Sequence, residues 1–131
     1  MTALRDLSKV FTVLAPDLTL HPREAGPELY QSLDEDFDQF RGHVLIAEHA
    51  FANDWPTWEM HPAGDELVVL LEGACTFLLR IDGTDQALEL GKSGEYAIVP
   101  QGVWHTAKVT TSTRMLFITP GEGTENRETP A

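Results

Sequence analysis

The sequence predicts an all-β fold, either a sandwich or a barrel, with one short helix near the N-terminus. Two features support this prediction: short runs rich in β-branched and aromatic residues recur along the chain, and glycine and proline separate them. Many short strands at even spacing are typical of a closed or two-layered β architecture. The chain has 131 residues, of which 42% are hydrophobic, so we expect residues 1–131 to form a single domain around one core.

Seven runs are predicted as strands. In chain order they are 9–14, 43–51, 66–73, 75–83, 95–100, 106–111 and 114–119. Turn-forming residues lie between them, as in IDGTD at 81–85 and ELGKSGE at 89–95. We expect the barrel core at 43–119, with N-terminal strands and the helix in 1–42. Residues 120–131 show no periodicity and are expected to form a flexible tail.

The one predicted helix lies in the segment GPELYQSLDEDFDQFRG at 26–42. Pro27 suits the first helical position, and Gly42 suits the end of the helix. Apolar residues follow at spacings of three and four, at Tyr30, Leu33, Phe37 and Phe40. We expect this apolar stripe to pack on the outside of the sheet.

The charge of the chain limits its partners. It has 21 acidic residues against 9 lysines and arginines, for a net charge of −12. This excess repels phosphate backbones and anionic lipids, so nucleic acid and membrane surfaces are excluded, and small molecules, metal cations or proteins remain. The apolar runs are too short to span a bilayer, and no signal peptide is recognised. The single cysteine, Cys75, cannot form an internal disulfide, so we expect a reducing, cytoplasmic compartment.

Four ionisable residues are expected to point toward the inside of the barrel, provided that the segments that carry them are extended. Side chains alternate along a strand, so Glu59 and His61 share one face of WEMH, and Glu66 opens the inward face of the next strand. His105 likewise shares a face with apolar residues. Burying these groups unpaired is costly, and a shared divalent cation removes that cost because imidazole and carboxylate are its ordinary ligands.

The same residues belong to two blocks with defined spacing. The first block is Asn53, five residues, Glu59, one residue, His61, four residues, Glu66, six residues and Gly73. It resembles the first motif of the cupin superfamily, in which glycine, two histidines, glutamate and glycine stand at these positions. Asn53 therefore replaces a glycine, and Glu59 replaces the first histidine.

The second block resembles the second cupin motif. It reads Gly94, five residues, Pro100, one residue, Gly102, two residues, His105, three residues and Val109. Val109 stands where that motif has asparagine, and the other four positions match. Two independent blocks make the resemblance specific, and it implies a double-stranded β-helix, or jelly-roll, barrel that holds one divalent transition metal (Fe, Mn, Ni or Zn).

The resemblance implies that Glu59, His61, Glu66 and His105 are the metal ligands. With two glutamates the site would be about neutral in charge, which favours harder ions such as Mn²⁺ or Fe²⁺. In a second arrangement His61, Glu66 and His105 alone bind the metal, and Glu59 acts beside it as a general base. The sequence leaves both arrangements open.

Two classes of function follow. The first is a metal-dependent enzyme, an oxygenase, isomerase or lyase, that acts on a small oxygen-bearing organic molecule. The second is a non-catalytic barrel that binds or senses a small molecule. The run LVVLL at 67–71 is apolar on both faces, so its outer face must also be covered, and we expect a homodimer, as is common among cupins.

The remaining histidines and the cysteine are expected to have structural roles. We expect His21, His43 and His49 at the surface or at strand edges, although His49 shares its strand face with Leu45 and could approach the pocket. Cys75 has no histidine nearby in the sequence and is expected to be a small core residue.

Overall fold

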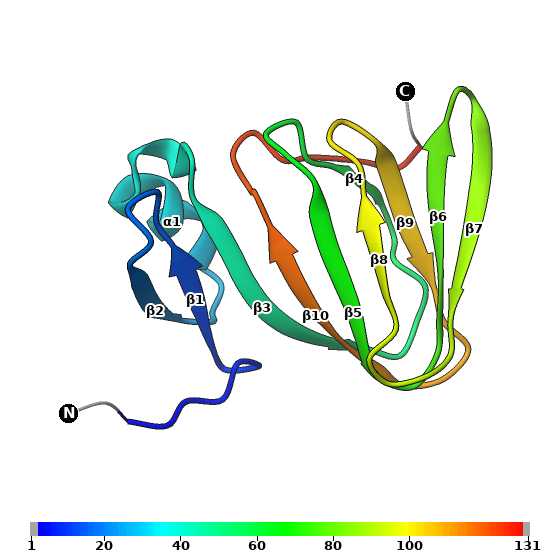
Figure 1. Cartoon of the computed structure of the whole chain (residues 1–131), viewed down its shortest axis with the longest axis horizontal. Helices are drawn as coiled ribbons and strands as arrows, with labels where there is room; N and C mark the ends of the chain where they lie inside the picture. Colours follow the sequence, from blue (N-terminus) through cyan, green and yellow to red (C-terminus); the bar gives the residue numbers. More distant parts are fainter. Residues whose placement is uncertain (1–2, 130–131) are drawn as a thin grey trace.

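The computed structural model describes residues 3–129 and contains two antiparallel β-sheets (Figure 1). The strands are β1 Val10–Leu14, β2 Leu20–Glu24, β3 Val44–Phe51, β4 Trp58–Met60, β5 Glu66–Glu72, β6 Cys75–Ile81, β7 Thr84–Leu90, β8 Tyr96–Val99, β9 Trp104–Lys108, β10 Thr113–Thr119 and β11 Glu125–Arg127. One sheet has the order β2-β1-β3-β10-β5-β8, and the other has the order β11-β4-β9-β6-β7. The predicted all-β fold is confirmed.

The main core lies between the two sheets. Val68 and Leu70 of β5, Phe77 of β6, Ala107 of β9 and Met115 of β10 are fully buried there. Buried residues alternate with more exposed ones along β1, β5, β6 and β8. The period-2 pattern of the sequence therefore defines the inner face, on which the site residues also lie.

A second apolar cluster lies where the six-stranded sheet extends beyond the barrel. Helix α1, Leu29–Asp36, and a 3₁₀ turn at Asp38–Phe40 cover this extension. The cluster consists of Phe11, Val13, Leu29, Leu33, Phe37, Phe40, Leu45 and Ala47. No helix within residues 3–129 is long and apolar enough to cross a membrane.

The helix is confirmed, but its predicted position and limits need correction. It packs on the face of β3 that bears Leu45 and Ala47, which is the inner face of the sheet and not the outer one. Tyr30, assigned to the apolar stripe, is largely exposed, and Leu29 is buried in its place. The sheet extends beyond the barrel, so its inner face remains open there for a helix to cover.

The sequence did not predict β2, β7 or β11 as strands, and it placed the start of β9 too late. β2 contains Pro22 and lies at a sheet edge, where a missing backbone N–H is tolerated. β7, also at an edge, is mostly exposed, so it lacks the alternation that identifies a strand. β9 begins at Trp104, earlier than predicted, and β11 forms within the segment expected to be a flexible tail, because it pairs with β4.

Candidate metal centre

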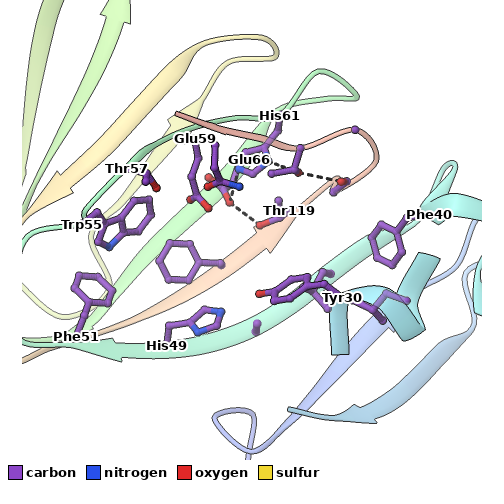
Figure 2. Close-up of a pocket in the computed structure, with 18 of the residues that line it drawn as sticks. Tyr30, Phe40, His49, Phe51, Trp55, Thr57, Glu59, His61, Glu66 and Thr119 are labelled. Carbon is purple, nitrogen blue, oxygen red and sulfur yellow. Dashed lines mark hydrogen bonds and ion pairs between the residues drawn. The ribbon is translucent and has the colours of Figure 1, made fainter. Parts of the chain in front are cut away.

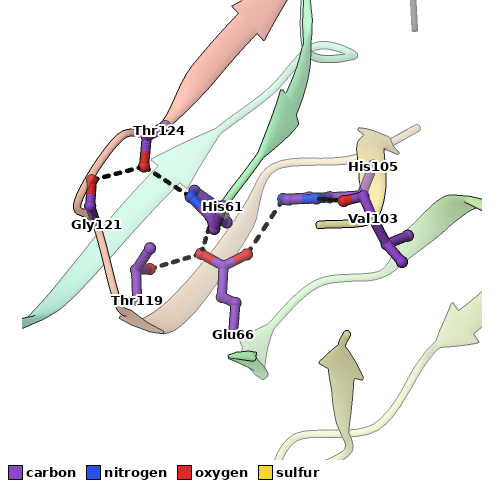
Figure 3. Close-up of polar contacts among 7 residues, drawn as sticks. All are labelled: His61, Glu66, Val103, His105, Thr119, Gly121 and Thr124. Carbon is purple, nitrogen blue, oxygen red and sulfur yellow. Dashed lines mark hydrogen bonds and ion pairs between the residues drawn. The ribbon is translucent and has the colours of Figure 1, made fainter. Parts of the chain in front are cut away.

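Both sheets contribute to one cluster of ionisable residues. Glu59 of β4 pairs across the ladder with His105 of β9, so their side chains leave the same face of the five-stranded sheet. His61 follows β4 on that face, and Glu66, the first residue of β5, reaches the cluster from the other sheet (Figure 3). The structure therefore brings together the four residues that the sequence selected.

Hydrogen bonds between two turns hold the two sequence motifs together. The N–H of Gly102 donates to the carbonyl of His61 at 3.0 Å. The neighbouring Gln101 donates its N–H to Asp65 Oδ1 at 2.8 Å and its side-chain amide to the carbonyl of Pro62 at 2.7 Å. Gly102 has a φ of 77°, a conformation that glycine adopts readily. The turn glycine thus fixes the position of His61 relative to the strand of His105.

The hydrogen bond made by Nδ1 of each histidine determines which ring nitrogen carries the proton. Thr124 donates its hydroxyl proton to the carbonyl of Gly121 at 2.9 Å, so its oxygen accepts from Nδ1 of His61 at 2.8 Å. Nδ1 of His105 donates to the carbonyl of Val103 at 3.1 Å. With the proton on Nδ1, each neutral imidazole presents a lone pair on Nε2, as metal-binding histidines do.

These lone pairs converge on a buried carboxylate. Nε2 of His61 lies 3.3 Å from one oxygen of Glu66, and Nε2 of His105 lies 3.2 Å from the other. The side chains are deeply buried: His61 is 5% exposed, Glu66 is 3% exposed and His105 is 0% exposed. Within residues 3–129, neither Nε2 atom nor Glu66 Oε1 has a hydrogen-bond partner, because lone pairs of the imidazoles face lone pairs of the carboxylate. Such a set is stable only with a cation or a proton between its members.

The donor set fits a divalent cation. Ligand atoms of Glu59, His61 and His105 all lie within 4.8 Å of one another. Glu66 is adjacent, held by a hydrogen bond that the hydroxyl of Thr119 donates to Oε2. Imidazole nitrogen with carboxylate oxygen is a donor set for Fe, Mn, Ni and Zn.

Burial and neighbouring charges shift the pKa values of the groups in this cluster. Burial opposes ionisation of Glu66, but its contacts with His105 and His61 outweigh burial and lower the pKa of Glu66 to about 2. Burial also opposes the charged form of His105, but the same carboxylate raises its pKa. Glu59 differs, because burial and the charge of Glu66 both raise its pKa.

A cavity of about 680 Å³ opens from this cluster toward helix α1 (Figure 2). His49 lines it, which corrects the expectation of a surface position, and its ring packs edge-on against Phe11 and Phe117. Trp55 also lines the cavity and contacts the ring of His105 at 6.2 Å between centroids. The cluster of ionisable residues is thus one end of a larger pocket.

The other residues that the sequence set aside lie away from the cluster. His21 and His43 pack against the ring of Phe37 beside the helix, with centroids 5.5 and 5.1 Å away. Cys75 is a buried free cysteine, as predicted. Burial raises the pKa of its thiol to about 12, so the thiolate is disfavoured and the residue is unreactive.

Sequence reasoning missed the contribution of the C-terminal segment. Thr119 contacts Glu66, Thr124 contacts His61, and Asn126 on β11 lies opposite Glu59 in the ladder. The segment has little periodicity because most of its contacts are single hydrogen bonds rather than a buried apolar face. A clue was present in PGEGT at 120–124, whose glycines allow close backbone approach.

Replacing Thr124 by valine is expected to weaken binding of divalent metal about 10- to 100-fold, because His61 loses the acceptor that fixes its tautomer. The measurement is competition against a metal-binding dye. Thr124→Ser keeps the hydroxyl and should retain affinity within a few-fold. Equal affinities for the two variants would show that this hydrogen bond does not position His61.

Comparisons with known proteins identify the fold. A cupin-2 domain protein from Shewanella frigidimarina superposes with a TM-score of 0.51 at 23% identity, over 59% of this chain and 70% of that one. Oxalate oxidase superposes with a TM-score of 0.53 at 19% identity, over 62% of this chain and 44% of that one. The Fe(II) enzyme HppE gives a TM-score of 0.50 at 18% identity, over 58% and 42%. The chain has the cupin fold.

No family model matches the sequence, and no curated protein matches it. The matched region spans less than half of oxalate oxidase and of HppE. At these identities the similarity establishes the architecture, and the chemistry has to be argued from the site itself.

Proposed function

We propose that this protein is a metal-dependent enzyme in which Glu59, His61, Glu66 and His105 hold one divalent transition metal. The observation that supports this most directly is the set of buried atoms without partners: Nε2 of both histidines and Oε1 of Glu66. Their neighbours Thr124 and Val103 orient the two imidazoles with Nε2 toward the same point. A metal ion satisfies all three atoms at once.

The ligand set favours Mn²⁺ or Fe²⁺, because two carboxylates and two neutral imidazoles give a nearly neutral site with hard oxygen donors. A metal held by these four residues would still have room to bind a small oxygen-bearing molecule. When bound, the metal supplies Lewis acidity or one-electron chemistry, as oxygenases, isomerases and lyases require. In the alternative arrangement, in which only His61, Glu66 and His105 bind the metal, the raised pKa of Glu59 suits it to accept a proton from a molecule in the cavity.

Elemental analysis of the protein, purified without a histidine tag and then loaded with Mn²⁺ or Fe²⁺, tests the site. We expect about one equivalent of metal per chain, lost in the His61→Ala, His105→Ala double variant. His49→Ala is the matched control, since His49 lines the same cavity outside the metal cluster, and it should keep its metal. A wild-type protein that cannot be loaded would overturn the proposal. A loaded protein that binds small molecules and converts none would be the binding or sensing barrel.

We also propose that a second copy of the chain covers the outer face of the six-stranded sheet. Ile46, Ile118, Leu67 and Ile98 form a continuous row across β3, β10, β5 and β8. Ile98 and Tyr96 at the edge are 55% and 62% exposed, which is unusual for large apolar side chains. The buried Cys75 is consistent with the cytoplasmic compartment that we propose for this dimer.

Light scattering coupled to size-exclusion chromatography should therefore give the mass of a dimer for the wild type and of a monomer for Ile98→Glu. Ala87→Glu, at an exposed position of β7 in the other sheet, should remain dimeric. A wild type that elutes as a monomer at all concentrations would exclude this interface.

A further inference from the structure

The cavity has two chemically different ends. At one end lie the carboxylates and imidazoles of the proposed metal site. The rest is walled mainly by apolar and aromatic side chains from β3, β10, the loop before β4 and the helix (Figure 2). The large side chains in this wall are those of Tyr30, Leu33, Phe40, Phe51, Trp55 and Phe117.

The aromatic wall is continuous rather than scattered. Trp55 contacts Phe51 at 5.8 Å and Phe117 at 5.9 Å between ring centroids. Tyr30 and Phe40 face it from the helical side of the cavity (Figure 2). Rings arranged in this way bind flat apolar or aromatic groups through area and edge-to-face contacts.

No lysine or arginine of the described chain lines the cavity. All nine lysines and arginines fall within the described residues, and none of them lines it. Its charged lining residues are the acids Asp34, Glu59 and Glu66. His49 adds no positive charge, because burial lowers its pKa, and the neutral ring offers one donor and one acceptor. An anionic group placed beyond the metal would therefore be desolvated without a partner.

The volume of the cavity is also larger than a small dianion needs. A cavity of about 680 Å³ lies within the range that holds a drug-sized organic molecule. A two-carbon dicarboxylate would leave the aromatic wall uncovered.

On the basis of the proposed metal site, we infer that the substrate binds the metal through oxygen atoms at one end and carries an uncharged, largely apolar or aromatic body. Small dianionic acids are excluded as the preferred class, because nothing beyond the metal pairs with a second negative charge. His49, which lines the cavity beyond the cluster, is the group available to a neutral polar substituent on that body.

Three hydroxamic acids test this inference, because each binds a metal through the same two oxygens and differs only in its body. Calorimetric titration of the Mn²⁺-loaded protein is expected to give about tenfold or tighter binding for benzohydroxamate than for acetohydroxamate, from burial of the ring. 4-Carboxybenzohydroxamate should bind at least about tenfold more weakly than benzohydroxamate, because its carboxylate is unpaired. The metal-free protein should bind none of them.

A variant separates the effect of the probe's charge on binding from the effect of its size. Tyr30→Arg places a cation at the helical side of the cavity, at a largely exposed position where folding should tolerate it. It should strengthen binding of 4-carboxybenzohydroxamate about tenfold, and it should affect binding of acetohydroxamate, which has no charged body, much less. Equal binding of all three probes to the wild type, or a preference for the carboxylate, would overturn the substrate class alone. Failure of every probe to bind a protein shown to contain metal would overturn the open metal site, and this inference with it.

Discussion

Glu59→Gln is expected to lower the affinity for Mn²⁺ or Fe²⁺ more than about 100-fold. Glutamine keeps the size of the side chain and removes the charge and the anionic oxygen, which lies within 4.8 Å of the ligand nitrogens of His61 and His105. Changes in residues that only orient ligands cost about 10- to 100-fold, so loss of a ligand should exceed that range. The measurement is metal competition, with circular dichroism to show that the fold is retained.

Two further variants help to explain the metal affinity measured for Glu59→Gln. Glu59→His restores the histidine found at this position in the first cupin motif and should bind metal, with a preference shifted toward softer ions. Asp34→Asn removes another carboxylate from the same cavity and should change metal affinity only a few-fold. If Glu59→Gln binds metal normally and loses only turnover, Glu59 is the general base and the ligands are His61, Glu66 and His105.

Gly73→Ala is expected to destabilise the fold by more than about 3 kcal/mol. Gly73 ends the first motif, between β5 and β6, and has a φ of 92°. A Cβ there would lie 2.5 Å from the carbonyl oxygen of Ser112 and 2.7 Å from Oγ1 of Thr113. Thr113 is fully buried and hydrogen-bonded to the carbonyl of Ala74, so it has little room to move. Urea denaturation measures the loss.

Gly94→Ala is the matched control for Gly73→Ala. Gly94 has a similar φ of 95°, but a Cβ there would meet no atom within 4 Å. It should cost only the backbone strain of an alanine in this conformation, about 1–2 kcal/mol. Similar losses for the two variants would show that conformation alone, and not the close approach of Ser112, requires glycine at position 73.

The sequence predicted the parts of the structure that depend on periodicity and motif spacing. The inner face of β5, with Val68 and Leu70 buried, follows from alternation along a strand. The meeting of Glu59, His61, Glu66 and His105 follows from the two motifs, whose resemblance to cupins the fold comparison supports. Strand β7 escaped prediction because its pairing with β6 depends on backbone hydrogen bonds, which leave no pattern in exposed side chains.

By itself, then, the sequence determined the all-β class, because burial and turn geometry act locally on residue type. The resemblance of its two motifs to those of cupins implied the barrel and the four residues at its centre. The tertiary structure alone decided what surrounds them. It brought the C-terminal segment against β4, so that Thr124 orients His61, and it turned the helix inward to wall the cavity beside His49. These contacts join segments that are far apart in the chain. They consist of single hydrogen bonds and of a helix that covers an otherwise uncovered sheet face. Neither kind of contact requires a repeating pattern of residue types in the sequence.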